Sequence, residues 1–285
     1  IAGLASVMRR KSLHVELDVP AIDIVGTGGD GSGSFNISTA AAFVAAGAGL
    51  HVAKHGNRAA SSRCGSADVL EALGVKIDLS PEGVKRCVEE AGIGFMFAPV
   101  YHPAMKHVAP TRREIGIRTV FNILGPLTNP ARAVSLVLGV PSEDIGNKMA
   151  AVLQRLGTEH SLVVHGCDGL DEVSPSGRTI IWDVQPGNVA PPYEVTPADF
   201  GYEAVPASAL TGGTPDVNAD ALRVVLAGKA CALRNAVIMN GAAALMAAGI
   251  TNDTLQAAAK AAEAIDSGKA IQKLDKLVEL SNRLE

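Results

Sequence analysis

The glycine-rich segment at residues 21–39, AIDIVGTGGDGSGSFNIST, constrains the fold of this chain more than any other stretch. A short apolar run at 22–25 ends in a loop with five glycines among its eight residues, 26–33, and an Ala-rich helical pattern follows. Glycines let backbone N–H groups crowd around a ligand, and the next helix adds the positive end of its dipole. A tight turn needs fewer glycines than this. The segment therefore predicts a seat for an anion, with phosphate as the favoured ligand.

The loop also fits, on paper, the Gly-x-Gly-x-x-Gly pattern of dinucleotide-binding proteins, with glycines at 26, 28 and 31. Such a unit needs an acidic residue about 20 positions further on, for the ribose hydroxyls. This chain has His51, Lys54 and His55 there. No Gly-Lys-Ser/Thr follows the loop, which excludes a P-loop. We interpret the loop as a phosphate site of another kind.

Strand-like and helical patterns alternate along most of the chain, which predicts an α/β fold with a mostly parallel sheet and helices on both faces. The predicted strands are 22–25, 50–53, 94–98, 133–140 and 161–165, and the predicted helices are 37–47, 67–73, 81–91 and 143–156. Residues 174–206, with several prolines, predict an antiparallel addition, and the chain is expected to be helical from 218 onward.

The alternation breaks between 99 and 129, where two helical patches, 103–109 and 112–121, precede GPLTNP. A chain of 285 residues exceeds the usual length of one domain. We predict a small all-helical subdomain from 1–18 and 99–124, and a large α/β domain from 19–98 and 125–285. Residues 1–11 have the pattern of a helix end closed by basic side chains. Because the chain has no initial Met, we expect N-terminal helices of the subdomain to be missing.

Composition excludes several classes of function. The formal net charge is −4, with 25 basic and 29 acidic residues and no long block of one sign, which argues against a general binder of nucleic acid or membrane surfaces. No apolar run reaches the ~18 residues of a membrane span, and no signal peptide is visible. The four cysteines are far apart and lack metal-ligand spacing. We expect reduced thiols and a cytoplasmic protein that acts on small molecules.

Cationic and hydroxyl side chains follow the second predicted strand. The segment KHGNR at 54–58 is followed by serines at 61, 62 and 66. Because the carboxyl ends of parallel strands meet at one edge of a sheet, this segment should face the glycine loop. Lys54 and Arg58 would supply positive charge, and the serines would donate to phosphate oxygens. A solvated basic turn is the alternative when the segment is taken alone.

An acidic segment, GCDGLDE at 166–172, follows the predicted strand 161–165. Adjacent carboxylates are the hard oxygen ligands that Mg²⁺ prefers when it also binds substrate phosphates. In isolation an acidic surface turn explains these residues equally well. Beside a phosphate site, the sequence favours metal binding by Asp171 and Glu172.

A further cluster lies in the segment that breaks the alternation, and contains His102, His107, Arg112, Arg113 and Arg118. Arginine at a cleft between domains suits bidentate capture of a carboxylate. A zinc site is disfavoured, because the two histidines are five positions apart, off one helix face, and have no third ligand nearby. For each histidine, a structural role stays open.

Five motifs, in this order and spacing, resemble those of the anthranilate phosphoribosyltransferase family: GTGGD (26–30), NIST (36–39), KHGNRAASS (54–62), RREIGIRTVFNILGPLTNP (112–130) and GLDEVSP (169–175). The resemblance extends over residues 1–285 and is densest in 22–175. It implies a homodimeric, Mg²⁺-dependent enzyme of tryptophan biosynthesis. The implied reaction transfers the 5-phosphoribosyl group of 5-phosphoribosyl-1-pyrophosphate to the amine of anthranilate and releases pyrophosphate.

The resemblance also implies a role for each matching residue. The phosphoribosyl donor would be held by Gly26, Gly29, Asp30, Ser34, Asn36, Ser38, Thr39, Lys54, His55, Gly56, Asn57, Arg58, Ala59, Ala60, Ser61, Ser62 and Ser66. Anthranilate would contact Gly26, His55, Asn57, His102, Arg112 and Pro126. The magnesium ligands would be Ser38, Asp171 and Glu172, and the catalytic residues Lys54, Arg112, Asp171 and Glu172.

One departure and two alternatives accompany this interpretation. Asn240-Gly241 stands where the family more often has Asn-Ala, which we expect to affect only helix packing. A pyrimidine nucleoside phosphorylase resembles the family in fold but would carry a Lys-His-Ser-Thr-Gly-Gly loop in place of GTGGD. A nucleic-acid-binding relative, or an inactive phosphate-binding module, is the non-enzymatic alternative. The acidic net charge and the complete set of expected site residues favour catalysis.

Overall fold

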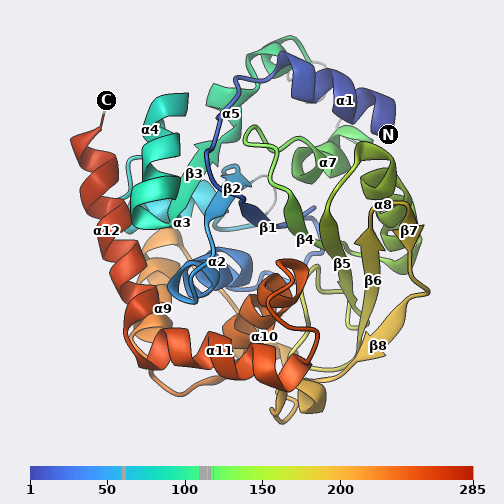
Figure 1. The fold of residues 1–285 in the computed structure, drawn as a ribbon. Helices are drawn as coiled ribbons and strands as arrows, with labels where there is room; N and C mark the ends of the chain where they lie inside the picture. Colours follow the sequence, from blue (N-terminus) through green and yellow to red (C-terminus); the bar gives the residue numbers. More distant parts are fainter. Residues whose placement is uncertain (60–61, 109–113, 115–116, 118, 285) are drawn as a thin grey trace.

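The structure is a computed structural model that describes residues 1–59, 62–108, 114, 117 and 119–284. A central sheet carries helices on its faces (Figure 1). The parallel strands are β1 (Ile22–Gly26), β2 (Val52–Gly56), β3 (Ile93–Phe97), β4 (Ser135–Gly139) and β5 (His160–Gly166). The antiparallel strands are β6 (Thr179–Gln185), β7 (Asn188–Val189) and β8 (Tyr193–Val195).

The strand order is β3-β2-β1-β4-β5-β6-β7, with β8 paired to β6. The predicted α/β class, its mostly parallel sheet and its antiparallel addition are therefore confirmed. The chain leaves β1 toward β2 on one side and later returns to β4 on the other side. In open α/β sheets, ligands bind at such a switch point, outside the carboxyl ends of the strands. The glycine loop leaves β1 at this point.

Two apolar layers cover the sheet because side chains alternate along each strand. In β4, Val137 belongs to one buried cluster, while Leu136 and Leu138 belong to the other. The first layer contains α2 (Ile37–Gly47) and α10 (Ala232–Ala247), which contact each other closely. The second contains α8 (Glu143–Leu156) and the buried Trp182. Figure 1 shows α8 on the opposite side of the sheet from α2.

The remaining α-helices are α1 (Ala2–Lys11), α3 (Ser66–Ala72), α4 (Pro81–Arg86), α5 (Ala98–Tyr101), α7 (Phe121–Leu124), α9 (Pro215–Leu226), α11 (Thr254–Asp266) and α12 (Lys269–Arg283). A π-helical turn spans Cys87–Ala91, and 3-10 turns span Pro103–His107, Gly125–Leu127, Pro197–Phe200 and Ala207–Leu210. Within the described residues, no helix is long and apolar enough to cross a membrane.

Most predicted strands and helices are found within one or two residues of their expected bounds, and two of them differ for a reason that the structure shows. The second strand, predicted at 50–53, is Val52–Gly56, because its pairing with β3 runs from Val52–Ile93 to Gly56–Phe97. The helix predicted at 81–91 changes at Cys87 from an α-helix to a π-turn, which ends at Gly92 with φ of 85°. Most of the patch predicted at 112–121 lies outside the described residues.

The two pieces of the predicted helical subdomain lie next to each other. The N–H of Leu13 donates to the carbonyl of Tyr101 at 2.9 Å. Ala5 of α1 is buried in the same cluster as Leu124 and Leu127. The division into two domains stays a prediction.

Gly241, the departure from the family pattern, lies on α10. A Cβ at this position would come 2.9 Å from Val44 of α2, so Gly241 lies at a contact between two helices.

Candidate active site

Four glycines of the loop after β1 are required by backbone conformation. Gly28, Gly29, Gly31 and Gly33 have φ angles of 69°, 74°, 73° and 61°. Residues with a Cβ rarely adopt this region, so these positions select glycine. The result is a chain that turns repeatedly above the end of β1.

At positions 26 and 139, only glycine leaves enough space for Asp171. A Cβ on Gly26 would lie 2.3 Å from Oδ2 of Asp171, and a Cβ on Gly139 would lie 1.6 Å from the Asp171 carbonyl oxygen. These glycines end β1 and β4, the central pair of the sheet. Their lack of side chains lets the acidic segment after β5 lie directly on the ends of both strands.

The acidic segment meets the glycine loop through backbone amides. Oδ2 of Asp171 accepts a hydrogen bond of 2.7 Å from the N–H of Gly28. Oε1 of Glu172 accepts one of 3.2 Å from the N–H of Ser38, in the first turn of α2. The predicted proximity of Asp171, Glu172 and Ser38 is therefore present in the structure. Segments 130 residues and more apart form one site.

Lys54 lies beneath this site and is 1% exposed. Its Nζ donates to the carbonyl of Ile24 at 2.6 Å. Burial lowers the pKa of Lys54, and the charges of Asp23 and Glu172 act against that change by raising the pKa. The sequence predicts that Lys54 supplies charge directly to a phosphate. In the structure Lys54 is buried, and the charges that act on it are those of Asp23 and Glu172.

The two carboxylates carry an excess of negative charge. Burial, followed by the charge of Asp30, raises the pKa of Asp171 to about 7. Burial, followed by the charge of Asp171, raises the pKa of Glu172 to about 8, although Lys54 acts in the opposite direction. Of these carboxylates, only Glu172 is offset by the charge of Lys54. A bound cation would offset the remaining negative charge and favour the ionised forms.

Asp171 and Glu172 fit a magnesium ion of the kind that substrate completes. Among the described residues, no three His, Cys, Asp or Glu side chains are placed to hold a metal by themselves. Mg²⁺ is usually bound by one or two protein carboxylates, with waters and substrate phosphates as the other ligands. Two buried carboxylates beside a phosphate-binding loop match that pattern.

His55 and His102 face each other at the edge of the site. Their Nε2 atoms are 3.1 Å apart, and the histidines are 3% and 6% exposed. Burial, followed by the charge of His102, lowers the pKa of His55 to about 3. Burial lowers the pKa of His102 to about 4. Both rings are neutral at pH 7.

Pro126 is buried in the 3-10 turn Gly125–Leu127, next to this pair of histidines. The backbone of Gly125 in the same turn forms a hydrogen bond with His55.

The loop after β2 is held by a different set of contacts from the one we expected. Arg58 donates to Glu71 at 2.7 and 3.0 Å and to Asp68 at 3.1 Å, so its charge is paired within the loop. Asn57 is exposed, and its Oδ1 accepts from the N–H of Arg58. Ala60, Ser61, Arg112, Arg113 and Arg118 lie outside the described residues.

Asn36, which the resemblance assigns to the phosphoribosyl donor, is bonded to Asn218, to which the sequence assigns no specific role. Asn218 Nδ2 donates to Oδ1 of Asn36 at 2.8 Å, and Asn218 Oδ1 accepts from the N–H of Gly213 at 2.7 Å. Asn36 Nδ2 in turn donates to the carbonyl of Cys64. A buried asparagine in a helix has no local sequence signature, so only the fold reveals this bridge.

Thr27 and Thr39 are further candidates. Their Oγ1 atoms are buried and have no hydrogen-bond partner among the described residues. Buried hydroxyl groups normally have a hydrogen-bond partner, so a buried hydroxyl without one at a candidate binding loop indicates a place for a ligand atom. Thr39 is among the predicted donor-binding residues, whereas Thr27 is not. Thr27 is the second residue of the GTGGD motif, which is the sequence signal that indicates it.

Comparison with known proteins agrees with this geometry. Residues 18–271 match the family model described as "Glycosyl transferase family, a/b domain". Two proteins named anthranilate phosphoribosyltransferase are each 55% identical to this chain. The one from Dehalococcoides mccartyi (strain 195) matches over 285 residues, covering all of the chain and 84% of the relative. The one from Chloroflexus aurantiacus (strain J-10-fl) matches over 282 residues, covering 99% and 83%.

Solved structures agree as well. Anthranilate phosphoribosyltransferase from Thermus thermophilus superposes with a TM-score of 0.94 at 47% identity, covering 99% of this chain and 84% of that one. The Saccharomyces cerevisiae enzyme in complex with PRPP and Mg gives a TM-score of 0.92 at 33% identity, covering 99% and 80%. This chain belongs to the glycosyl transferase family and, within it, to the anthranilate phosphoribosyltransferases.

Proposed function

We propose that this protein transfers the 5-phosphoribosyl group of 5-phosphoribosyl-1-pyrophosphate to the amine of anthranilate, with release of pyrophosphate, in tryptophan biosynthesis. The observation that carries the proposal is the seating of Asp171 and Glu172 on the amides of Gly28 and Ser38. The relatives at 55% identity support it, as do the yeast complexes with PRPP and Mg and with 4-fluoroanthranilate.

In this proposal the glycine loop and the first turn of α2 hold the phosphate groups of the donor through backbone N–H groups. Asp171 and Glu172, with Ser38, hold Mg²⁺, which when bound supplies positive charge to the pyrophosphate. Lys54 offsets the charge of Glu172 from below. Donors fixed in advance toward developing negative charge are among the strongest contributions to catalysis.

The acceptor side works by positioning. As the C1–O bond to pyrophosphate breaks, the amine nitrogen forms its bond to C1 with inversion and afterwards loses a proton. The lone pair of a neutral aryl amine needs no strong general base. His55 and His102, both neutral at pH 7, fit beside such an amine. We assign Asn57 and Arg112 to anthranilate, with Arg112 on its carboxylate. Alignment of two bound substrates contributes up to ~7–11 kcal/mol in favourable cases.

A fluorescence assay tests the function. With the donor and Mg²⁺ present, anthranilate fluorescence should decrease, and omission of either should abolish the decrease. Phosphorolysis of thymidine without consumption of anthranilate would reassign the protein to the nucleoside phosphorylases. Tight, steeply salt-dependent DNA binding without turnover would support the non-enzymatic alternative.

We further propose a cytoplasmic homodimer whose interface uses the helical subdomain. Leu4 and Val7 on α1 are each 45% exposed, and they lie three positions apart on one helix face. Apolar side chains grouped in this way are typical of an interface.

A further inference from the structure

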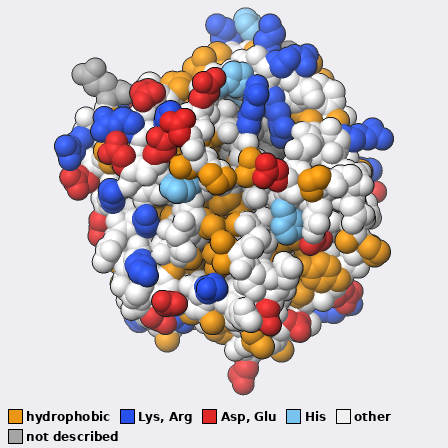
Figure 2. Space-filling view, in the orientation of Figure 1, with side chains coloured by type: hydrophobic (Ala, Val, Ile, Leu, Met, Phe, Trp, Pro, Cys, Tyr) orange, Lys and Arg blue, Asp and Glu red, His pale blue; other side chains and the backbone are white. Residues whose placement is uncertain are grey.

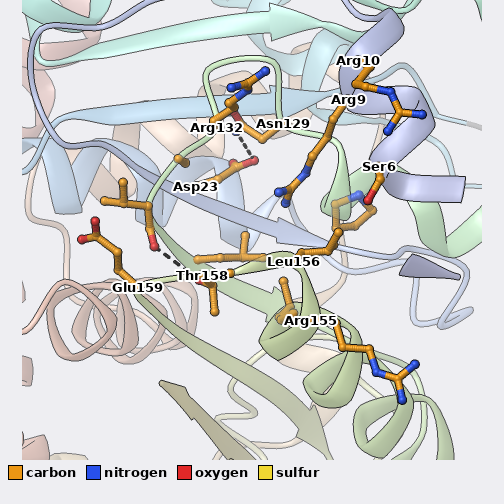
Figure 3. Close-up of a pocket in the computed structure, with 16 residues that line it drawn as sticks. Ser6, Arg9, Arg10, Asp23, Asn129, Arg132, Arg155, Leu156, Thr158 and Glu159 are labelled. Carbon is orange, nitrogen blue, oxygen red and sulfur yellow. Dashed lines mark hydrogen bonds between the residues drawn. The ribbon is translucent and has the colours of Figure 1, made fainter. Parts of the chain in front are cut away.

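A cavity of about 430 Å³ lies beneath α1, at the end of β4 opposite to Gly139. Its wall comes from the C-terminal half of α1, the turn before β4 and the loop from α8 to β5, as Figure 3 shows. Its volume is within the ~300–1,000 Å³ range of small-molecule sites. The glycine loop, Asp171 and Glu172 are not part of its lining.

Arginines dominate the polar lining, which contains Arg9, Arg10, Arg132 and Arg155 against Asp23 and Glu159. Figure 3 shows the guanidinium group of Arg9 extending into the cavity, while Arg10 and Arg155 extend outward from its rim. The Nε of Arg9 donates to the carbonyl of Leu127 at 2.7 Å. Within the described parts of the chain, nothing accepts from its Nη atoms, and no carboxylate pairs with any of the four arginines.

The positive charge in the cavity is not neutralised by Asp23. The carboxylate of Asp23 already accepts from Asn129 Nδ2 at 2.8 Å and from the N–H groups of Ile24 and His55. Burial also raises the pKa of Asp23 to about 6. Burial, followed by the charge of Arg132, lowers the pKa of Arg9. Arg9 is half-buried, while Arg10, Arg132 and Arg155 are exposed. A half-buried guanidinium group that no carboxylate among the described residues pairs with favours a bound anion.

Helix capping explains only part of this arrangement. Arginines in the last turn of α1 compensate the helix dipole, which accounts for Arg9 and Arg10. Arg132 comes from another segment, and among the described residues it is the only non-glycine residue with a positive φ, 51°. Glycine would adopt this conformation more easily. The guanidinium group, rather than the backbone, is therefore the reason for an arginine at this position.

We propose that this cavity is a second ligand site, separate from the glycine loop, which binds a small organic anion. A carboxylate or phosphate group would bind between Arg9 and Arg132. The apolar part would lie against Leu136, Leu153 and Leu156, which line the same cavity. Asp23 forms part of the wall, belongs to β1 and accepts from the N–H of His55 in β2. The ligand would therefore lie next to a strand that leads to the active site.

Calorimetric titration with benzoate, phenyl phosphate and the neutral benzyl alcohol tests the proposal. At least one of the two anions should bind, and benzyl alcohol should not. Arg9→Gln and Arg132→Gly should each weaken binding by about tenfold, the loss expected for one charge-assisted contact. Arg132→Gly removes the cation while relieving the positive φ, so it should keep or raise the melting temperature and stay folded.

Two controls separate this cavity from the active site. Saturation with 5-phosphoribosyl-1-pyrophosphate and Mg²⁺ should leave the anion bound, and so should Arg112→Gln, which removes the residue assigned to anthranilate. The proposal is overturned if neither anion binds at millimolar concentration. It is also overturned if binding survives both cavity variants, or if the donor or Arg112→Gln abolishes it. A carboxylate-only or phosphate-only result identifies the charged group.

Discussion

Adjacent acidic residues of this protein have separate partners. Asp171 binds the amide of the glycine loop, and Glu172 binds the first turn of α2 while facing Lys54. Their buried charge is tolerable only with a proton or a cation bound. In the proposed function, the charge of a bound Mg²⁺ would offset both carboxylates.

Asp171→Asn and Glu172→Gln should each raise the Mg²⁺ concentration required for half-maximal rate by about tenfold or more, or abolish turnover, because each removes a charged ligand. Rates measured across a Mg²⁺ titration check this. Asp168→Asn, an isosteric change on the same loop at an exposed position, is the matched control. An unchanged Mg²⁺ dependence in both site variants would exclude the metal assignment.

Gly139→Ala should lower the free energy of unfolding by about 2–3 kcal/mol, because a Cβ would collide with the backbone of Asp171, which cannot move as a side chain can. Gly177→Ala, where a Cβ meets nothing within 4 Å, should change it by ~0.5 kcal/mol or less. Urea denaturation of both variants measures the difference. Equal stability would show that the acidic segment does not rest on β4 as described.

His102 should make the protein less stable in acid. Its pKa is about 4 in the folded chain, below the usual 6.5, so the unfolded chain binds more protons between these values. Stability must therefore rise with pH across this window and fall on acidification, by about 3 kcal/mol for this group. His102→Gln should flatten the dependence of unfolding free energy on pH between 4 and 6.5. An equally steep dependence in the variant would mean that His102 is protonated when folded.

Elements far apart in sequence hold the glycine loop in place. The N–H of Gly212 donates to the carbonyl of Gly33 at 2.9 Å, and Ser34 forms a β-bridge with Thr211. Asn218, at the start of α9, ties the same segment to Asn36. The loop is thus a preformed part of the fold, supported by a helix nearly 200 residues away.

Asn218→Ala should raise KM for the donor about tenfold, since two hydrogen bonds of ~1 kcal/mol each position the loop. KM for anthranilate should change little, because the partners of Asn218, Asn36 and Gly213, belong to the segments that we assign to the donor. Steady-state kinetics with each substrate varied in turn measure the split. A parallel rise in both KM values would indicate general destabilisation. Asp220→Asn on the same helix, at an exposed position, is the control.

On the scale of the whole molecule, charge and apolar surface are distributed differently. Figure 2 shows basic and acidic side chains mixed over the viewed face, with basic ones gathered at the upper edge, where Figure 1 places α1. This mixture agrees with a net charge of −4 and with small-molecule substrates. Helix α1 combines this basic end with the exposed Leu4 and Val7.

The double variant Leu4→Asp and Val7→Asp should shift the protein from dimer to monomer, because it places charge in an apolar contact. Light scattering across a range of protein concentrations measures the mass. Val224→Asp and Leu255→Asp, which are exposed on α9 and α11, form the matched control and should stay dimeric. A monomeric wild type, or a dimer that survives in the α1 variant, would remove α1 from the interface.

The amino-acid sequence alone predicts the α/β class, the parallel strands with their intervening helices, and the residue types of the site. These depend on local patterns: alternation, glycine spacing and polar residues at strand ends. Boundaries such as that of β2 were less certain, because strand pairing rather than local preference fixes them.

The partners of each charged side chain, in contrast, follow from the folded chain and not from its local patterns. The fold buried Lys54 beside Glu172, paired Arg58 with Glu71 and brought Asn218 to Asn36. It also placed Arg9 and Arg132 in the lining of one cavity, which no sequence motif predicts. The physical reason is that burial, pairing and pKa depend on neighbours distant in sequence. A local pattern predicts which groups are available, and the fold decides which of them meet.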